Sequence, residues 1–197
     1  FLVNTSLTIG AKLDFLPTTL EHVKTEKPSV SLLVPILTCY GVSFTDDSSI
    51  QTACHSEIMV FDSTNLKRKT TASMGNGEAV SAAVMVGNTL LTKGVSFKNK
   101  KYITYIGSME HPTQTVLHSE DLDDNLQLMA GLSANKDYIA SIDIVNKLLK
   151  VFLLTTREHL YDIQLTNMKY PRGVCLAVDA VLITDMQGGT LSKYFLS

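Results

Sequence analysis

The sequence has few cysteines, little charge and no long apolar run, and each shortage excludes a class of protein. Charged residues make up 18% of the 197 positions, and the formal net charge is −2. The chain therefore lacks the broad basic surface that nucleic acid or an anionic membrane attracts. The apolar run from Val30 to Val34 is interrupted by Ser31 and ended by Pro35. It falls far short of the roughly 18 residues of a membrane-spanning helix, so we expect no membrane partner.

Three cysteines occur, Cys39, Cys54 and Cys175. An odd and sparse set without Cys-x-x-Cys spacing argues against a disulfide framework and against a structural zinc site. Cys175 lies in an apolar run and is interpreted as a small buried hydrophobic residue. A reducing compartment fits this usage, so we expect a cytoplasmic location.

The chain begins with Phe1-Leu2-Val3, which has no basic n-region and no initiating Met. It is therefore not an intact signal peptide, and the missing Met suggests that a longer chain precedes it. Apolar residues make up 45% of the sequence, which is enough to build a core. The length leaves room for one large domain or two small ones.

Strand patterns dominate the sequence. Short runs rich in Val, Ile, Thr, Tyr and Phe are bounded by Gly, Asn, Asp, Ser and Pro, which is typical of strands and turns. The best helical candidate is 119–130, which has an acidic start, although Leu126-Gln127-Leu128 also alternates as a strand does. The predicted strands are 41–45, 58–61, 80–86, 89–92, 102–106, 138–144, 148–154 and 160–165, with three more in 174–195.

A unit of three strands followed by a more variable fourth recurs four times, at a period of roughly 40 residues. Each unit opens with a small residue followed by Val or Leu, and its third strand ends in a hydrophobic pair. The third interval is the longest and leaves room for an insertion around 108–124. The opening pairs are Gly41-Val42, Ala79-Val80, Gly131-Leu132 and Gly173-Val174, and the closing pairs are Val60-Phe61, Tyr102-Ile103, Val151-Phe152 and Tyr194-Phe195.

Four short strands at this period predict an all-β protein, a β-propeller of four-stranded antiparallel blades. A single blade exposes two apolar faces, and stacking blades around an axis covers them. Four units are recognisable, and the total number of blades stays open.

The segment 161–196 resembles the NHL repeats that form propellers at the C-terminal end of many tripartite-motif (TRIM) proteins. Their pattern has Pro, then Gly-Val or Gly-Ile, an apolar strand, an Asp-containing turn, and a third strand ending in a pair such as Val-Phe. The segments 131–165 and 41–67 resemble it too, whereas the unit opening at Ala79 is degenerate. The matching residues are Pro171, Gly173, Val174, Asp185 and Tyr194-Phe195; Gly131, Asp143, Asn146, Val151 and Phe152; and Gly41, Val42, Val60, Phe61 and Asp62.

We expect one propeller domain over 1–197, with 1–35 a poorly matched N-terminal segment and 36–197 the NHL-like blades. NHL propellers usually have more blades than the four units found here, so either residues are missing or the propeller is smaller than usual. The last unit stops after its third strand. An N-terminal strand within 6–13 could complete that blade and close the ring.

The resemblance also implies where a ligand binds. In such propellers, ligands meet the face formed by the loops that enter each innermost strand and the turns that join the second and third strands. Tyr and Arg are common energetic anchors at interfaces, so Tyr40, Tyr170 and Arg172 are the first candidates, with packing within the fold the alternative for each. The full set of binding candidates is Tyr40, His55, Glu57, Asn146, Lys147, Tyr170, Arg172 and Gln187.

Two alternatives would make the chain catalytic or metal-dependent. Cys54 and His55 could form a nucleophile and a base, but adjacent residues of a strand point to opposite faces. We therefore expect no catalytic residues. Calcium-dependent propeller hydrolases place Glu, Asn and Asp side chains in the central channel, and Glu78, Asp124 and Asn125, which lie just before predicted innermost strands, are the candidates for this role. The stretch from Asp121 to Asn125 lacks the Gly and Glu that an EF-hand requires.

RNA binding is the remaining alternative, because some NHL propellers read RNA with a basic face. Two short basic runs, 67–69 and 98–101, support it, and the net charge of −2 opposes it. We interpret the chain as a non-catalytic protein-interaction module without a cofactor, the substrate-recognition end of a TRIM-like protein of the ubiquitin pathway. Its partner would be a protein or a peptide segment. A calcium-dependent lactonase or esterase, or an RNA-binding propeller, are the alternatives.

Overall fold

The computed structural model describes residues 6–8, 31–33, 39–45, 47, 49–75, 77–122, 131–177 and 180–196, with side chains described from residue 41 onward. The chain divides into two units, Phe1–Thr38 and Cys39–Ser197. In the first unit, β1 (Ser6–Thr8) pairs antiparallel with β2 (Ser31–Leu33). The assignment of 1–197 to a single domain stays a prediction.

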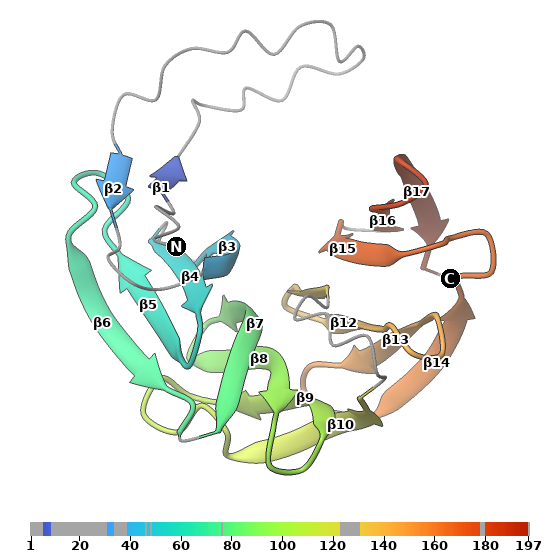
Figure 1. The fold of residues 1–197 in the computed structure, drawn as a ribbon, viewed down its shortest axis with the longest axis horizontal. Helices are drawn as coiled ribbons and strands as arrows, with labels where there is room; N and C mark the ends of the chain where they lie inside the picture. The colour runs from blue at the N-terminus through green and yellow to red at the C-terminus, as the bar shows by residue number, and fades with distance from the viewer. Residues whose placement is uncertain are drawn as a thin grey trace, which may run out of the picture. The chain divides into compact units, whose positions relative to one another are not determined.

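The second unit is all-β, and its four antiparallel sheets are arranged as a four-blade β-propeller, which confirms the predicted fold class (Figure 1). Each sheet is a blade whose strands follow one another along the chain. Blade 1 holds β3 (Cys39–Phe44), β4 (Ile50–Cys54), β5 (Glu57–Phe61) and β6 (Arg68–Ser73); blade 2 holds β7 (Glu78–Val86), β8 (Thr89–Ser96), β9 (Lys101–Gly107) and β10 (Thr115–Asp121); blade 3 holds β11 (Leu132–Ala134), β12 (Tyr138–Asp143), β13 (Leu148–Leu153) and β14 (His159–Gln164); blade 4 holds β15 (Pro171–Leu176), β16 (Ala180–Asp185) and β17 (Thr190–Phe195).

The apolar side chains of the strands pack between neighbouring blades. Between blades 1 and 2, Ile58 packs in one cluster with Val80 and Leu90. Between blades 3 and 4, Leu149 and Ile183 belong to a second cluster. A third cluster joins blades 2 and 3 and contains Leu91, Ile106, Leu132, Ile139 and Phe152. Each fully buried Leu or Ile contributes about 1.5–3 kcal/mol, so the stacking of blades is the main source of stability.

The structure corrects three expectations about single segments. The prediction of a helix over 119–130 is wrong for 119–121, because these residues belong to strand β10, and 123–130 lie outside the described residues. The insertion expected within 108–124 is wrong over 115–121 for the same reason. Ser6–Thr8 does not complete the last blade: it pairs with β2, and within the described part of the chain β17 pairs with β16 alone.

The failed helix has a physical cause. Thr115 to Asp121 pairs along the length of β9, and this tertiary pairing outweighs a weak local preference for helix.

Among the described residues, no helix reaches the length and apolar character needed to cross a membrane.

Candidate functional site

Backbone hydrogen bonds tie the turns between second and third strands to the loops between blades. The N–H of Met74 donates to the carbonyl of Ser56 in the turn of blade 1 over 2.9 Å. The N–H of Phe97 in the turn of blade 2 donates to the carbonyl of Gly77 over 3.0 Å. The chain between blades 1 and 2 therefore contacts the turns of both blades.

The loop between blades 3 and 4 repeats this arrangement. The N–H of Leu165 donates to the carbonyl of Lys147, and the N–H of Met186 donates to the carbonyl of Tyr170, each over 2.9 Å. These repeated bonds bring turns and loops together at one end of the blades. We call this surface the turn face and define it as residues 55–56, 74–75, 77, 97–100, 144–147, 165–170 and 186–189.

Two buried aspartates hold the turn face in shape. The Asp143 carboxylate accepts hydrogen bonds from the N–H of Asn146 at 2.9 Å and from its side-chain amide at 3.0 Å. The Asp185 carboxylate accepts from the backbone N–H groups of Lys169 at 2.7 Å, Tyr170 at 2.8 Å and Gln187 at 3.1 Å. Burial alone would raise the pKa of Asp185, but these hydrogen bonds outweigh it and hold that pKa below its ordinary value.

The structure places most of the predicted binding residues on or beside the turn face. His55, Asn146, Lys147 and Gln187 lie exposed in turns. Glu57 is half-buried at the start of β5, and Tyr170 is half-buried in the loop before β15. Arg172 is the second residue of β15, where its Nη1 donates to the sulfur of Met186. Tyr40 lies on β3, and its side chain is outside the described residues. A binding role for each stays a prediction.

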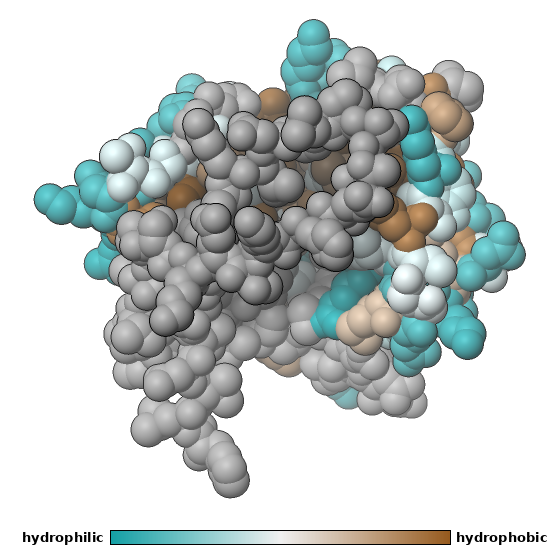
Figure 2. Space-filling view, turned by 90° about the horizontal axis from the view of Figure 1, so that it is seen from above, coloured by the Kyte–Doolittle hydropathy of each residue, from teal (hydrophilic) through white to brown (hydrophobic). Residues whose placement is uncertain are grey.

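Sequence reasoning missed three exposed hydrophobic residues on the turn face. Phe97, Val145 and Met186 are 46%, 41% and 49% exposed, and each lies in the turn between second and third strands of its blade. In the sequence, a large apolar residue inside an otherwise polar turn could have indicated each of these positions. Hydrophobic surface also lies between hydrophilic residues in the space-filling view of Figure 2.

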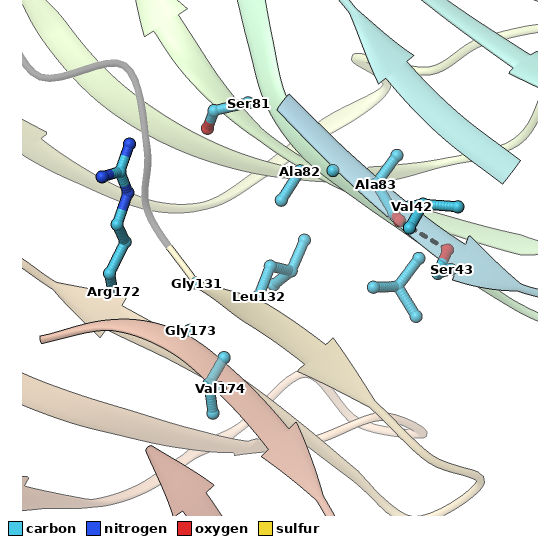
Figure 3. A pocket seen from close by; sticks show the side chains of 12 residues that line it. Val42, Ser43, Ser81, Ala82, Ala83, Gly131, Leu132, Arg172, Gly173 and Val174 are labelled. Carbon is cyan, nitrogen blue, oxygen red and sulfur yellow. Dashed lines mark hydrogen bonds between the residues drawn. The ribbon is translucent and has the colours of Figure 1, made fainter. Parts of the chain in front are cut away.

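A cavity of about 250 Å³ lies where the innermost strands β3, β7, β11 and β15 meet. Its lining is mainly aliphatic and includes Val42, Ala83, Leu132 and Val174, with Arg172 toward one end (Figure 3). The polar side chains of the lining are those of Ser43, Ser81 and Arg172.

A cluster of buried polar side chains lies between blades 2 and 3, on the side of β8 away from the blade 1 core. Lys93 of β8 is fully buried, and its ammonium donates to Glu120 Oε1 at 2.8 Å, to Ser141 Oγ at 3.2 Å and to the carbonyl of Ile142. Burial lowers the pKa of Lys93 and raises the pKa of Glu120, while the Lys93 charge opposes the rise. All three ammonium protons thus find acceptors, two of them in blade 3.

His118 and Asp143 extend this cluster. His118 Nε2 lies 3.8 Å from Glu120 Oε1 and 3.8 Å from Asp143 Oδ2, longer than a hydrogen bond. Burial would raise the pKa of Asp143, but polar contacts with His118 and Asn146 outweigh it and lower that pKa. No sequence motif marks this cluster, because its members come from β8, β10 and β12.

Of the residues considered for a calcium site, Glu78 lies in the described part of the chain, at the start of β7. The Tyr105 hydroxyl donates to Glu78 Oε1 at 2.7 Å, and burial together with this bond raises the pKa of Tyr105. Asp124 and Asn125 lie outside the described residues. Calcium binding there stays a prediction of the alternative hypothesis.

Two expectations about cysteine are corrected. Cys175 is exposed and free, because it lies on β15 with its side chain outside the blade 3–blade 4 core. Cys54 is disulfide-bonded, contrary to the expected absence of disulfides. In the strand register, Cys54 stands opposite Cys39, a pairing that sequence spacing alone does not reveal.

Comparison with known proteins gives similarity of fold alone. No protein-family profile and no curated protein sequence matches the chain. Solved propellers do match. The β-propeller domain of Cps50 (Swd1) from Myceliophteria thermophila is 11% identical with a TM-score of 0.56, over 88% of this chain and 61% of that one. Hsv2 of Kluyveromyces lactis is 14% identical with a TM-score of 0.53, over 82% of this chain and 46% of that one.

A chain in a crystal structure of the mitotic checkpoint complex is 14% identical with a TM-score of 0.56, over 85% of this chain and 52% of that one. These neighbours include WD40 propellers. The chain spans about half the length of the structures that it matches. The fold is thus similar to that of WD40 propellers, while the NHL assignment stays a prediction.

Proposed function

We propose that this chain is a non-catalytic recognition module that binds an acidic peptide segment of a partner protein on the turn face. The observation that carries the proposal is the repeated arrangement of that face. The turns between the second and third strands of blades 2, 3 and 4 each present one exposed hydrophobic residue, and backbone hydrogen bonds tie these turns to the interblade loops. Apolar side chains ringed by polar groups are typical of protein-binding surfaces.

The charge of the turn face selects the chemistry of the peptide. Its exposed lysines are Lys98, Lys100, Lys147 and Lys169, and none forms an ion pair with a residue in the described part of the chain. The acidic groups Asp143 and Asp185 are buried and already accept hydrogen bonds from the turns. The face therefore offers net positive charge beside apolar anchors, which complements Asp or Glu next to Leu or Phe.

The finer part of the proposal rests on the NHL resemblance. Pro171, Gly173 and Asp185 match the NHL pattern, and Asp185 has the structural role of tying the turn to the entering loop. On this basis the module would select substrates for a TRIM-like ubiquitin ligase whose RING domain lies outside this chain. The cytoplasmic location belongs to the same proposal.

The position of the basic runs favours a peptide over RNA. Residues 67–69 lie at the junction of β5 and β6, whereas residues 98–101 lie at the junction of β8 and β9. These junctions emerge at opposite ends of the antiparallel blades, so the runs do not join into one basic face. Lys69 also pairs with Asp47 over 3.3 Å.

Selection from a random peptide display library on the purified chain tests the proposal. We expect enriched peptides to combine Asp or Glu with Leu or Phe, and their affinity to fall as salt is raised. Lys147→Glu should weaken binding about three- to tenfold, as should Val145→Ser through loss of an apolar anchor. Lys136→Glu is the matched control, because Lys136 is exposed in the β11–β12 turn at the other end of blade 3.

Three results would overturn the proposal: no enriched peptide, enriched peptides rich in Lys and Arg, or equal losses in Lys147→Glu and Lys136→Glu. Binding of single-stranded RNA with a steep salt dependence would favour the RNA alternative in its place.

A further inference from the structure

We infer that His118, Glu120 and Asp143 form a binding site for a first-row divalent metal ion, with Zn²⁺ the best fit, at the junction of blades 2 and 3. The site shares Asp143 with the turn of blade 3, but its test is metal binding and does not depend on peptide binding at the turn face. One donor atom from each of the three residues lies within 4.8 Å of the other two.

The local structure of β10 brings the first two donors together. The β9–β10 register shifts between Val116 and His118, a bulge that changes which side chains face inward. After the shift, His118 and Glu120 are two residues apart and lie on the same face of the strand. Asp143 ends β12 in blade 3 and meets them from across the junction.

Two of the donors have a buried atom without a hydrogen-bond partner among the described residues. These atoms are Glu120 Oε2 and His118 Nε2, and both are inaccessible to solvent. The Glu120 side chain is only 3% exposed, and the other oxygen of its carboxylate is already held by Lys93. An unpartnered buried polar atom costs about 1–3 kcal/mol, so these two atoms point to a bound species.

The distances fit a metal better than a direct contact. His118 Nε2 is 3.8 Å from both carboxylates, too far for a hydrogen bond. Ligand bonds of about 2.0–2.2 Å place tetrahedral donors about 3.3–3.6 Å apart, so small side-chain rotations would bring all three donors within bonding distance of the metal. A water molecule would complete a three-residue set of this kind.

The charges allow a cation at this place. Lys93 neutralises the carboxylate of Glu120. The ammonium of Lys150 lies 3.4 Å from Asp162 Oδ2 and 3.9 Å from Asp143 Oδ2, so it is shared by these two carboxylates. With neutral His118, the three carboxylates and two lysines leave one negative charge for the metal to bind. An imidazole donor and only two carboxylates suit Zn²⁺ and disfavour Ca²⁺, which requires six to eight oxygen ligands.

The test is calorimetric titration of the full chain with zinc chloride after chelator treatment, together with melting curves. We expect one Zn²⁺ per chain, and a Tm higher by about 5–10 °C when free zinc exceeds the Kd a hundredfold. Calcium chloride should give neither effect. His118→Gln should abolish the Tm rise and lower the zinc affinity at least about tenfold, while leaving the apo Tm close to wild type because His118 Nε2 has no hydrogen-bond partner among the described residues.

His159→Gln is the matched control, because His159 lies exposed 2.7 Å from Asp162 and offers an ordinary surface His–Asp pair. Glu120→Gln serves as the second variant, should His118→Gln fail to fold. The inference is overturned if zinc does not bind, if zinc leaves the Tm unchanged, or if His159→Gln removes the effect while His118→Gln keeps it.

Discussion

Replacing Lys93 by Met should cost far more stability than the loss of one surface charge. The Lys93 ammonium donates to Glu120, Ser141 and Ile142, and both side chains of the ion pair are at most 3% exposed. The substitution removes these bonds and leaves the Glu120 carboxylate buried with no cation in contact. Breaking a buried pair on one side costs about 3–5 kcal/mol. For a chain of this length, that lowers the Tm by roughly 6–20 °C.

Urea unfolding, followed by far-UV circular dichroism, measures the loss. The double variant Lys93→Met/Glu120→Leu should recover most of it, since two apolar side chains of similar volume replace both charges. Lys101→Met is the control: Lys101 pairs with Asp121 on the surface at 3.3 Å, and its loss should cost less than about 1 kcal/mol. The reasoning is refuted if Lys93→Met costs as little as Lys101→Met, or if the double variant is less stable than Lys93→Met.

Three further predictions concern packing, acid stability and thiol chemistry. Gly131→Ala should lower the free energy of unfolding by about 1–3 kcal/mol, because an added Cβ would lie 2.5 Å from the carbonyl oxygen of Arg172. Gly41→Ala should cost less, because its nearest contact would be at 3.3 Å. Equal losses of stability in urea unfolding would contradict this prediction. Folding lowers the pKa of Asp185, so the stability contributed by its carboxylate is present above the ordinary pKa of the carboxyl and is lost as pH falls through the lower pKa of the folded state. Asp185→Asn should therefore reduce the dependence of the Tm on pH in an acid titration. An unchanged dependence would contradict this prediction. Cys175 should react with a maleimide in the folded protein and Cys54 should not, so mass spectrometry after labelling should show no adduct on Cys175→Ser.

Much of the blade architecture could be predicted from sequence because blades are built from local pairings. Runs such as 80–86 and 148–154 fall on β7 and β13, and the Gly-Val and Gly-Leu pairs mark innermost strands. Hairpin partners are close in sequence, so the turn residues between them fix the register. The turn positions of Asn146, Lys147 and Gln187 followed directly from this pattern.

The buried cluster could not be predicted in the same way. Lys93 meets Glu120 and Ser141 through the stacking of blades 2 and 3, at sequence separations of 27 and 48 residues. One signal was present: Lys93 alternates with the buried residues Leu91 and Val95, and a charged residue at a core-facing position implies a buried partner. The bulge that turns His118 inward has no comparable signature, since it arises from the pairing of β10 with β9.

The stacking of each blade on the one before it has a consequence for synthesis. The three apolar clusters join blades 1 and 2, blades 2 and 3, and blades 3 and 4, all consecutive along the chain. A ribosome that adds about 5–20 residues per second needs roughly 2–8 s for a blade of about 40 residues, whereas a hairpin forms in microseconds. Each blade therefore has time to form its sheet and dock on the preceding one before the next emerges, and each docking step covers the apolar face that the preceding blade had left exposed.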